Sequence, residues 1–414
     1  MSAPIPVLWI TGPAGVGKST VSWQLFTELA AAGVPVAFVD TDQIAMCYPA
    51  PPDDLGRERI KARNFGALLP GYALAGARCV VANGVLDPVI GLNKAAIPWA
   101  DVLICRLRAD LDELTDRFTG RYRSEEDLGE LLAQTLAEAD GMEASGIGDV
   151  CADTSGLTAN EVARLVRATC RDWPGFGDPV QLAADADRAA RSAEQAADPD
   201  ADSGHPAPLP ASADPGASRP ADDKDGRVLL LCGPTGVGKS TIGFDVYLHS
   251  LRSGPTAGYV DLAQLGFVRP APAGDPGGHR LKARNVGAMW RTFMASGARQ
   301  LVVTGPVGGQ AELECYLDAL RPSIVTVVRL HASRDELAER IGFRGEGGGW
   351  NEPGDPLRGQ PAAFLDRVID ESVAQAEALD RADVPMIRFD TSGRTAAESA
   401  NVIATSILHN DLEQ

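Results

Sequence analysis

Two glycine-rich segments contain residue types that bind phosphate. The first is Gly12-x4-Gly17-Lys18-Ser19, which follows an apolar run at residues 7–11. The second is Gly233-x4-Gly238-Lys239-Ser240, which follows an apolar run at residues 228–232. Glycines let successive backbone N–H groups point at phosphate oxygens, and the N-terminus of a following helix adds positive charge. The lysine can neutralise terminal phosphates and the hydroxyl can bind Mg²⁺. Both segments match the P-loop pattern, so we predict phosphate binding at each.

The expected phosphate ligands form two matching sets. They are Gly12, Gly15, Gly17, Lys18, Ser19 and Thr20 in the first segment, and Gly233, Gly236, Gly238, Lys239, Ser240 and Thr241 in the second. The numbering offset between the two sets is a constant 221, as for Lys18 and Lys239. The repeat predicts two copies of one nucleotide-binding unit.

Acidic residues follow the next apolar run in each copy. In the first copy this place reads Asp40-Thr41-Asp42, and in the second it reads Asp261-Leu262-Ala263. One acid could hold Mg²⁺ through water while the other orients or deprotonates an acceptor hydroxyl, although a merely polar strand end is the alternative. The expected metal ligands are Ser19, Asp40, Ser240 and Asp261. Because the second acid is missing after Asp261, the first copy is expected to be the better equipped for catalysis.

Basic residues recur at matching positions as well. The Lys-Ala-Arg-Asn segments contain Lys61, Arg63 and Asn64 in the first copy, and Lys282, Arg284 and Asn285 in the second. On a helix near the cleft they would suit an anionic or polyhydroxyl acceptor, and a solvated helix face is an equally good interpretation. His279 and His331 have no counterparts in the first copy and are assigned no role.

Two pairs of arginines have a spacing of four residues. They are Arg117 and Arg121, and Arg340 and Arg344, so each pair shares a helical face if the helix continues that far. In a lid they could close on the phosphates and stabilise charge in the transition state. Ordinary surface arginines are the alternative. A glycine-rich insertion at residues 345–356 of the second copy is predicted to be a mobile lid.

The pattern of apolar runs predicts an α/β fold. In the first copy a strand, the glycine loop, a helix at residues 20–32 and a strand at residues 34–40 form a βαβ unit, which implies a parallel sheet with a right-handed crossover. Its ligand should lie at the carboxyl ends of the strands. Further helices are expected at residues 59–75, 110–119 and 124–139, with a last one ending near residue 169. Further strands are expected at residues 79–82 and 102–107.

The chain divides into three parts by composition. We predict P-loop domains at residues 1–172 and 227–414, each a mostly parallel sheet flanked by helices. Residues 173–226 are rich in Ala, Pro and Asp, and are expected to be a disordered linker because they cannot bury enough apolar area to fold. The two domains are expected to form a pseudo-dimer within one chain, and the protein is expected to be a monomer.

Charge and cysteine usage exclude several classes of protein. The 414-residue chain has a net charge of −18, which argues against binding nucleic acid and favours small-molecule partners. Its seven cysteines form no C-x-x-C pair, so a zinc site or a disulfide framework is not expected. Neither a secretory leader nor a membrane span is expected. These features predict a cytoplasmic protein.

The motifs together resemble the small P-loop kinases of the nucleoside/nucleotide, shikimate, gluconate and adenylylsulfate kinase group. The resemblance covers residues 1–170 and 227–410. It implies ATP and Mg²⁺ as cofactors, with Lys18 and Ser19 on phosphate and metal. It also implies catalytic roles for Asp40 and Asp42 at metal and acceptor and for Arg117 and Arg121 in a lid. The usual acidic Walker B pattern is not evident, because the third strand ends in Asn83 or Thr304. The aspartate that ends the second strand would take its place, as in adenylylsulfate-kinase-like proteins.

Two functions are compatible with these features. The leading hypothesis is an ATP-dependent phosphotransferase that acts on a hydroxyl of a small-molecule acceptor. The alternative is a nucleotide-binding regulator, in which ATP changes how the two domains dock and no small-molecule acceptor is involved.

Overall fold

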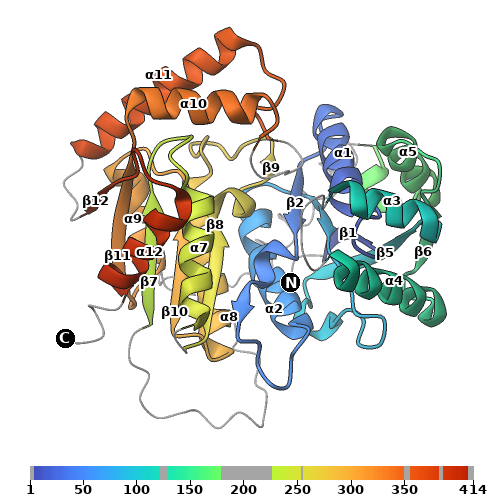
Figure 1. The fold of residues 1–414 in the computed structure, drawn as a ribbon. Coiled ribbons are helices and arrows are strands. Elements are labelled where there is room, and N and C mark those ends of the chain that lie inside the picture. Colours follow the sequence, from blue (N-terminus) through green and yellow to red (C-terminus); the bar gives the residue numbers. More distant parts are fainter. Residues whose placement is uncertain are drawn as a thin grey trace, which may run out of the picture.

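A computed structural model describes residues 4–121, 128–178, 226–252, 255–348, 355–381 and 386–408. It has two mostly parallel sheets, each flanked by helices, which confirms the predicted α/β class (Figure 1). We call residues 4–178 the first unit and residues 226–408 the second unit. Residues 179–225, which make up most of the predicted linker, and residues 349–354 of the predicted lid lie outside the described residues.

The first unit alternates strands and helices along the chain. Its strands are β1 (Ile5–Thr11), β2 (Val36–Asp40), β3 (Cys47–Tyr48), β4 (Cys79–Asn83), β5 (Ala100–Arg108) and β6 (Val150–Asp153). Its helices are α1 (Lys18–Ala31), α2 (Glu58–Leu74), α3 (Leu111–Arg121), α4 (Leu128–Ser145) and α5 (Ala159–Thr169), with short 3₁₀ helices at Gln43–Ala45, Lys94–Ala96 and Pro174–Phe176. Most predicted elements of this unit are confirmed, and α4 extends beyond the predicted end at residue 139.

The second unit follows the same plan, with one added helix. Its strands are β7 (Arg227–Cys232), β8 (Ala257–Asp261), β9 (Val268–Arg269), β10 (Gln300–Thr304), β11 (Ile324–His331) and β12 (Ile387–Asp390). Its helices are α7 (Lys239–Arg252), α8 (His279–Ala295), α9 (Gln310–Ala319), α10 (Arg334–Gly345), α11 (Ala362–Asp380) and α12 (Ala396–Ile403), with a 3₁₀ helix at Leu262–Leu265 and a π-helix at Ala404–Leu408. Helix α9 occupies the place of the 3₁₀ helix at Lys94–Ala96.

Local sequence sets the helix boundaries in the same way in both units. Helix α5 begins with a capping box in which Thr158 and Glu161 satisfy each other's backbone N–H groups, and α12 begins with the same box from Thr395 and Glu398. Helix α1 begins directly after Gly17, which has a φ of 101° that favours glycine. Trp173 is buried and packs edge-on against Phe176, so the packing of the first unit extends beyond residue 172.

Each unit contributes one short strand to the sheet of the other. The strand orders are β6-β5-β1-β4-β2-β9 and β12-β11-β7-β10-β8-β3, so β9 of the second unit ends the first sheet and β3 of the first unit ends the second. Both added strands are antiparallel to their neighbours, with Ala37 opposite Val268 and Tyr48 opposite Ala257. The two units therefore exchange edge strands reciprocally, which covers one edge of each sheet.

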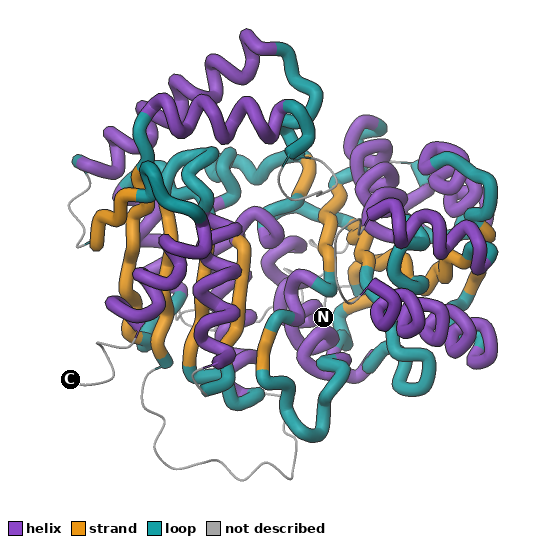
Figure 2. The backbone as a smooth tube through the Cα atoms, viewed as in Figure 1, coloured by secondary structure: helices purple, strands orange, loops and turns teal. Residues whose placement is uncertain are grey.

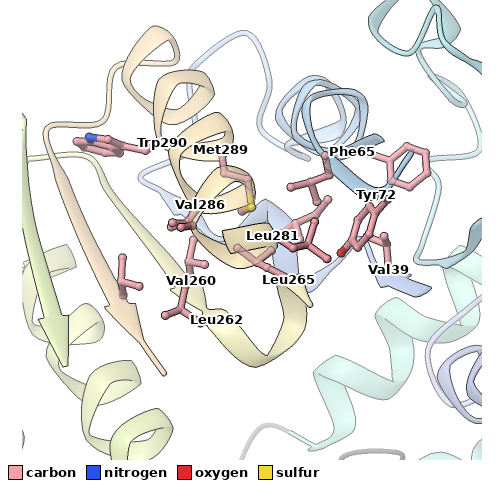
Figure 3. Packing of buried hydrophobic residues seen from close by; sticks show 14 of the residues in the cluster. Val39, Phe65, Tyr72, Val260, Leu262, Leu265, Leu281, Val286, Met289 and Trp290 are labelled. Atoms are coloured by element: carbon pink, nitrogen blue, oxygen red, sulfur yellow. The ribbon is translucent and has the colours of Figure 1, made fainter. Parts of the chain in front are cut away.

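A shared hydrophobic core lies between the two sheets. Helices α2 and α8 pack against each other there, and the loops and helices around them are seen in the tube view (Figure 2). Figure 3 shows Phe65 and Tyr72 of the first unit on one side of this core, with Leu281, Met289 and neighbouring residues of the second unit on the other. At the crossing, a Cβ on Gly71 would lie 2.2 Å from Asn285 Oδ1, so only glycine permits this approach. One core thus joins both units.

Two further cores cover the outer faces of the sheets. The core beneath α1 and α5 includes Phe267 from the second unit, and the core beneath α7 and α12 includes Met46 from the first. All seven cysteines are free thiols. No helix in the described part of the chain is long and apolar enough to cross a membrane.

Candidate active site

The two P-loops have the same backbone conformation. Their glycines all have positive φ values, which are 146°, 78° and 101° at Gly12, Gly15 and Gly17, and 144°, 83° and 93° at Gly233, Gly236 and Gly238. A Cβ on Gly12 would lie 2.5 Å from the Leu107 carbonyl oxygen, and one on Gly233 would lie 2.6 Å from that of Leu330. Each loop joins a central strand to a helix N-terminus, where backbone N–H groups and the helix dipole favour an anion.

The P-loop lysines lie over their own loops. Lys18 Nζ donates to the Pro13 carbonyl oxygen at 2.9 Å, and Lys239 Nζ donates to that of Pro234 at 2.7 Å. Burial lowers the pKa of Lys18, and burial lowers the pKa of Lys239 to about 8. Aspartates nearby oppose both shifts. Two buried ammonium groups in glycine-rich loops are well placed to neutralise the phosphates of a nucleotide.

Ser19, Asp40 and Asn83 meet beside the first P-loop. The Ser19 hydroxyl is 3.5 Å from Asp40 Oδ2, and the Asn83 amide donates to that oxygen at 3.2 Å and to Ser19 Oγ at 3.4 Å. The sheet brings them together because Asp40 is opposite Asn83, whose other neighbour is Ile10 on the P-loop strand. Burial raises the pKa of Asp40 to about 7, and the charge of Asp42 adds to the increase. A half-buried carboxylate beside a hydroxyl is a site that a cation would stabilise.

The second unit has a related group of residues. Ser240 Oγ donates to Asp261 Oδ2 at 2.6 Å, and the other carboxylate oxygen accepts from the Ala263 N–H at 2.9 Å. Thr304 stands where the first unit has Asn83, opposite Asp261 in the sheet. The Tyr259 hydroxyl lies 3.2 Å from Thr304 Oγ1 and donates to the Ser240 carbonyl oxygen. The serine and aspartate are therefore paired in both units.

These oxygen donors fit Mg²⁺ better than a transition metal. In each unit a serine hydroxyl and one carboxylate converge, and hard cations of this kind take such ligands together with water and phosphate oxygens. Within the described residues no group of three or more His, Cys, Asp or Glu side chains could hold a metal ion by itself. The remaining ligands would thus have to come from the nucleotide and water, as is usual where Mg²⁺ accompanies ATP.

Asp42 follows Asp40 by two residues and has defined partners. Its Oδ1 forms an ion pair with Lys61 Nζ at 3.1 Å, and its Oδ2 accepts from the Val85 N–H at 3.3 Å. Lys61 also pairs with Glu58 at 3.1 Å and donates to the Val85 carbonyl oxygen. Burial by itself would lower the pKa of Lys61, but Asp42 and Glu58 outweigh it and the pKa is raised. The Asp42 side chain is 44% exposed, so it is held in place yet open to a ligand.

Glu138 of α4 is a site residue that the sequence did not single out. Burial raises its pKa, and its charge interacts with those of Lys18, Asp42 and Lys61, which places it at the same cleft. Helix α4 is fixed over the site because Glu143 pairs with Arg106 at 2.6 Å. The leucines of α4 predict the helix from the sequence. No sequence pattern indicates that Glu138 lies near Lys18 and Asp42.

Helix α11 stands over the second site in the same manner. Asp380 pairs with Arg329, as Glu143 pairs with Arg106, and Gln375 precedes Asp380 by the same five residues that separate Glu138 from Glu143. The Gln375 amide donates to the Val307 carbonyl oxygen, in the loop after β10. Position 138 in the first unit and position 375 in the second are therefore equivalent in sequence spacing but differ in charge.

The Lys-Ala-Arg-Asn segments divide between cleft and core. Lys61 and Lys282 lie at the cleft, while Arg63 and Arg284 are exposed. Asn64 and Asn285 are fully buried, and they donate to the carbonyl oxygens of Ile44 and Leu265 at 2.6 and 2.9 Å. These asparagine amides thus hold the loops that follow Asp40 and Asp261, and neither reaches solvent.

The predicted lid arginines contact protein rather than open space. Arg117 donates to the carbonyl oxygens of Val16 and Thr154 at 3.2 and 3.0 Å, and Arg340 makes the matching bonds to Val237 and Thr391. Each arginine thereby ties the P-loop to the turn after the outermost parallel strand. Arg344 forms an ion pair with Asp355 at 3.0 Å. The side chain of Arg121 lies outside the described residues, and Thr20 and Thr241 follow the P-loop serines on the first helical turns.

Parts of this chain are similar to several solved structures. Solved structures similar to part of this chain include the tunicamycin resistance protein of Deinococcus radiodurans, with 17% identity and a TM-score of 0.29 over 44% of this chain and 95% of that one. A gluconokinase from Sinorhizobium meliloti 1021 has 18% identity and a TM-score of 0.30 over 45% of this chain and 95% of that one. For a shikimate kinase from Aquifex aeolicus vf5 the values are 15% and 0.28, over 45% and 99%.

No protein-family model matches the sequence, and no curated protein matches it either. Because the likenesses to solved structures combine low identity with low TM-scores, the reaction has to be inferred from the residues of this chain's own sites.

Proposed function

We propose that the protein transfers the γ-phosphate of ATP to a hydroxyl group of a small-molecule acceptor, and that the first unit is the better equipped to do so. The observation that carries the proposal is the position of Asp42. It lies two residues beyond the half-buried Asp40 and is held by Lys61 and the Val85 N–H, while 44% of its side chain remains exposed. Phosphoryl transfer needs a positioned carboxylate of this kind beside the phosphate site.

The residues of the first unit have separate roles in the proposed phosphoryl transfer. Lys18 and the loop N–H groups bind and neutralise phosphate oxygens, and Ser19 and Asp40 would hold Mg²⁺, which neutralises further phosphate charge when bound with ATP. Asp42 accepts the proton of the acceptor hydroxyl as its oxygen attacks the γ-phosphorus. The bond between the γ-phosphorus and the bridging oxygen breaks, and ADP departs with the electron pair. Arg117 acts indirectly, because it fixes the P-loop at Val16.

A screen of acceptors with purified protein tests this proposal. ADP release is measured with ATP, Mg²⁺ and separate polyols, sugar acids, cyclic hydroxy acids, nucleosides and adenylylsulfate. Asp42→Asn should lower acceptor-dependent ADP release by about 10²–10⁴-fold while ATP binding is retained, because proton transfer to a positioned base contributes a factor of that size. Asp53→Asn is the control, since Asp53 is exposed and pairs only with Arg59 among the described residues.

One observation favours a regulatory function instead. The segment that follows Asp40 runs directly into β3 of the second sheet, and the segment that follows Asp261 runs into β9 of the first. Nucleotide bound at one site could thereby shift the edge of the other sheet. Tight ATP binding at both sites without turnover on any acceptor in the screen would favour this switch and count against the phosphotransferase.

A further inference from the structure

The acceptor side of the second unit carries different chemical groups from that of the first. By the constant offset, His279 stands at the position of Glu58, and Ala263 stands at that of Asp42. Gln375 replaces Glu138 in the helix above the cleft. The second unit thus lacks all three carboxylates that surround Lys61 in the first unit. A different set of residues has taken their place.

His279, Glu312 and Tyr316 form a connected polar cluster there. His279 Nε2 is 3.3 Å from Glu312 Oε2, and His279 Nδ1 is 2.9 Å from the Tyr316 hydroxyl. Tyr316 is fully buried and its ring stands edge-on to the imidazole, so the histidine is fixed from the protein side. Burial lowers the pKa of His279, which favours the neutral ring. The Glu312 side chain is 37% exposed and is the open end of the cluster.

Glu312 takes the structural place of Asp42 although it comes from another element. In the first unit Asp42 accepts from the N–H of Val85, in the loop that follows the central strand β4. In the second unit Glu312 accepts from the N–H of Gly308, in the loop that follows the central strand β10. Helix α9, which carries Glu312, has no helical counterpart of similar length in the first unit. A carboxylate therefore binds the equivalent loop in both units.

Lys282 differs from Lys61 in what surrounds its charge. Lys61 is 6% exposed and pairs with two carboxylates. Lys282 donates to the Gly277 carbonyl oxygen at 2.8 Å and forms no ion pair among the described residues. Burial lowers its pKa, and the charges of Asp275, Asp261 and Glu312 oppose that shift, so Lys282 lies near both Asp261 and the cluster. A half-buried ammonium without an anionic partner favours binding an anion.

We propose that the second unit has its own acceptor site for a hydroxyl compound that bears an anionic group, with Lys282 receiving the anion, Glu312 acting on the hydroxyl and His279 positioning Glu312. This inference rests on the proposed phosphotransferase function. Glu312 accepts the hydroxyl proton, the freed oxygen forms a bond to the γ-phosphorus of ATP bound at Lys239, and ADP leaves with the electrons of the broken bond. The first unit, whose lysine is already neutralised, would accept uncharged polyols instead.

The test isolates the second unit in the full-length protein. Lys18→Ala removes nucleotide from the first P-loop, and ADP release is then measured with two matched pairs of probes, which are glycerate with glycerol and gluconate with sorbitol. The acidic member of a pair should stimulate release and the neutral member should not. In this background Glu312→Gln should lower the stimulated rate by about 10²–10⁴-fold. Glu314→Gln on the same helix is exposed and should leave the rate unchanged.

Three further variants, at two positions, separate positioning and binding from folding. His279→Gln, whose amide can still donate to Glu312, should retain more kcat than His279→Ala, with KM for ATP unchanged in both. Lys282→Met should raise KM for the acid with a smaller effect on kcat. ATP binding to the second site by calorimetry, together with thermal unfolding, shows whether each variant is folded.

The possible outcomes distinguish the two proposals. If the wild type turns over an acceptor in the screen and Lys18→Ala turns over none, the phosphotransferase proposal stands and the inference about the second unit is wrong. Equal stimulation by acid and neutral probes, or an unchanged rate in Glu312→Gln, also contradicts the inference. If the wild type itself transfers phosphate to no acceptor, both proposals fail.

Discussion

The two sites share their phosphate side and differ on their acceptor side. Both loops have the same glycine conformations, the same lysine contact and a serine paired with a strand-end aspartate. Across the cleft, the first unit surrounds Lys61 with Asp42 and Glu58, while the second leaves Lys282 without an ion pair among the described residues and adds His279 beside Glu312. The phosphate side is built from backbone geometry, which tolerates little change. The acceptor side is built from side chains, which can be replaced one at a time.

The largest expected effect comes from removing either P-loop lysine. Lys18→Ala and Lys239→Ala should each abolish one of two equivalents of ATP in a calorimetric titration, because losing a buried charged contact costs about 2–5 kcal/mol of binding. The remaining equivalent should bind as in the wild type if the two sites are independent. Binding of a single equivalent by the wild type would contradict the likeness of the two loops.

A smaller effect is expected from residues that one unit contributes to the core of the other. Phe267 follows the metal-site loop of the second unit, yet it packs edge-on against Trp23 of the first, with ring centroids 5.1 Å apart. Its carbonyl oxygen accepts from the Phe38 N–H at 3.0 Å. Phe267→Ala should lower the free energy of unfolding by about 1–3 kcal/mol, less than for a fully buried phenylalanine.

The measurement for Phe267 is urea unfolding followed by tryptophan fluorescence. Phe343→Ala is the matched control, because Phe343 is 60% exposed, and it should change stability by less than about 0.5 kcal/mol. If both variants unfold like the wild type, the exchanged segment does not stabilise the first unit. The two units would then not stabilise each other through this segment.

The smallest effect is expected from the titration of His279. Its neighbours are Glu312 and Tyr316 on α9, Lys282 on its own helix and Asp275 in the preceding loop. Burial lowers its pKa below that of an unfolded histidine, so the unfolded chain binds more protons and stability falls as the pH drops through about 6.5. The slope is less than about 1.4 kcal/mol per pH unit for one proton.

Urea unfolding between pH 5 and 7 measures this slope. His279→Gln should flatten it, because the substituted side chain does not titrate, whereas Glu314→Gln should not. A wild-type slope that His279→Gln leaves intact would show that other groups account for the acid sensitivity of the second unit. The replacement of Glu58 by His279 at the same position of the second unit would then have no effect on how stability depends on pH.

Much of this architecture can be predicted from the sequence. The glycine, lysine and serine spacing places both P-loops, and the long apolar runs before them predict the central parallel strands. The aspartates at the ends of β2 and β8 are also predicted, because the carboxyl ends of parallel strands meet at one edge of the sheet. These features depend on residues close together in the chain. The structure adds that the Asn83 amide donates hydrogen bonds to Asp40 and Ser19.

The exchanged strands could not be predicted in the same way. β3 and β9 have two residues each, too few for any alternation of apolar and polar side chains to be recognised. Their pairing depends on the packing of α2 against α8, which brings distant segments together. Glu312 was missed for a related reason, since no signal near Ala263 points to a helix about fifty residues later. Arg117 has the spacing expected of a lid residue, yet tertiary contacts fix it against Val16 and Thr154.

We propose that the first unit moves phosphate to an acceptor through Asp42. A single-turnover experiment in Lys239→Ala with ATP labelled at the γ-phosphate, Mg²⁺ and the best acceptor from the screen tests it most directly. The label should appear on the acceptor, and adding Asp42→Asn should slow its appearance by about 10²–10⁴-fold without loss of bound ATP. If the label is found only in inorganic phosphate or stays in ATP with every acceptor, or if Asp42→Asn transfers it as fast as the parent, the account is wrong.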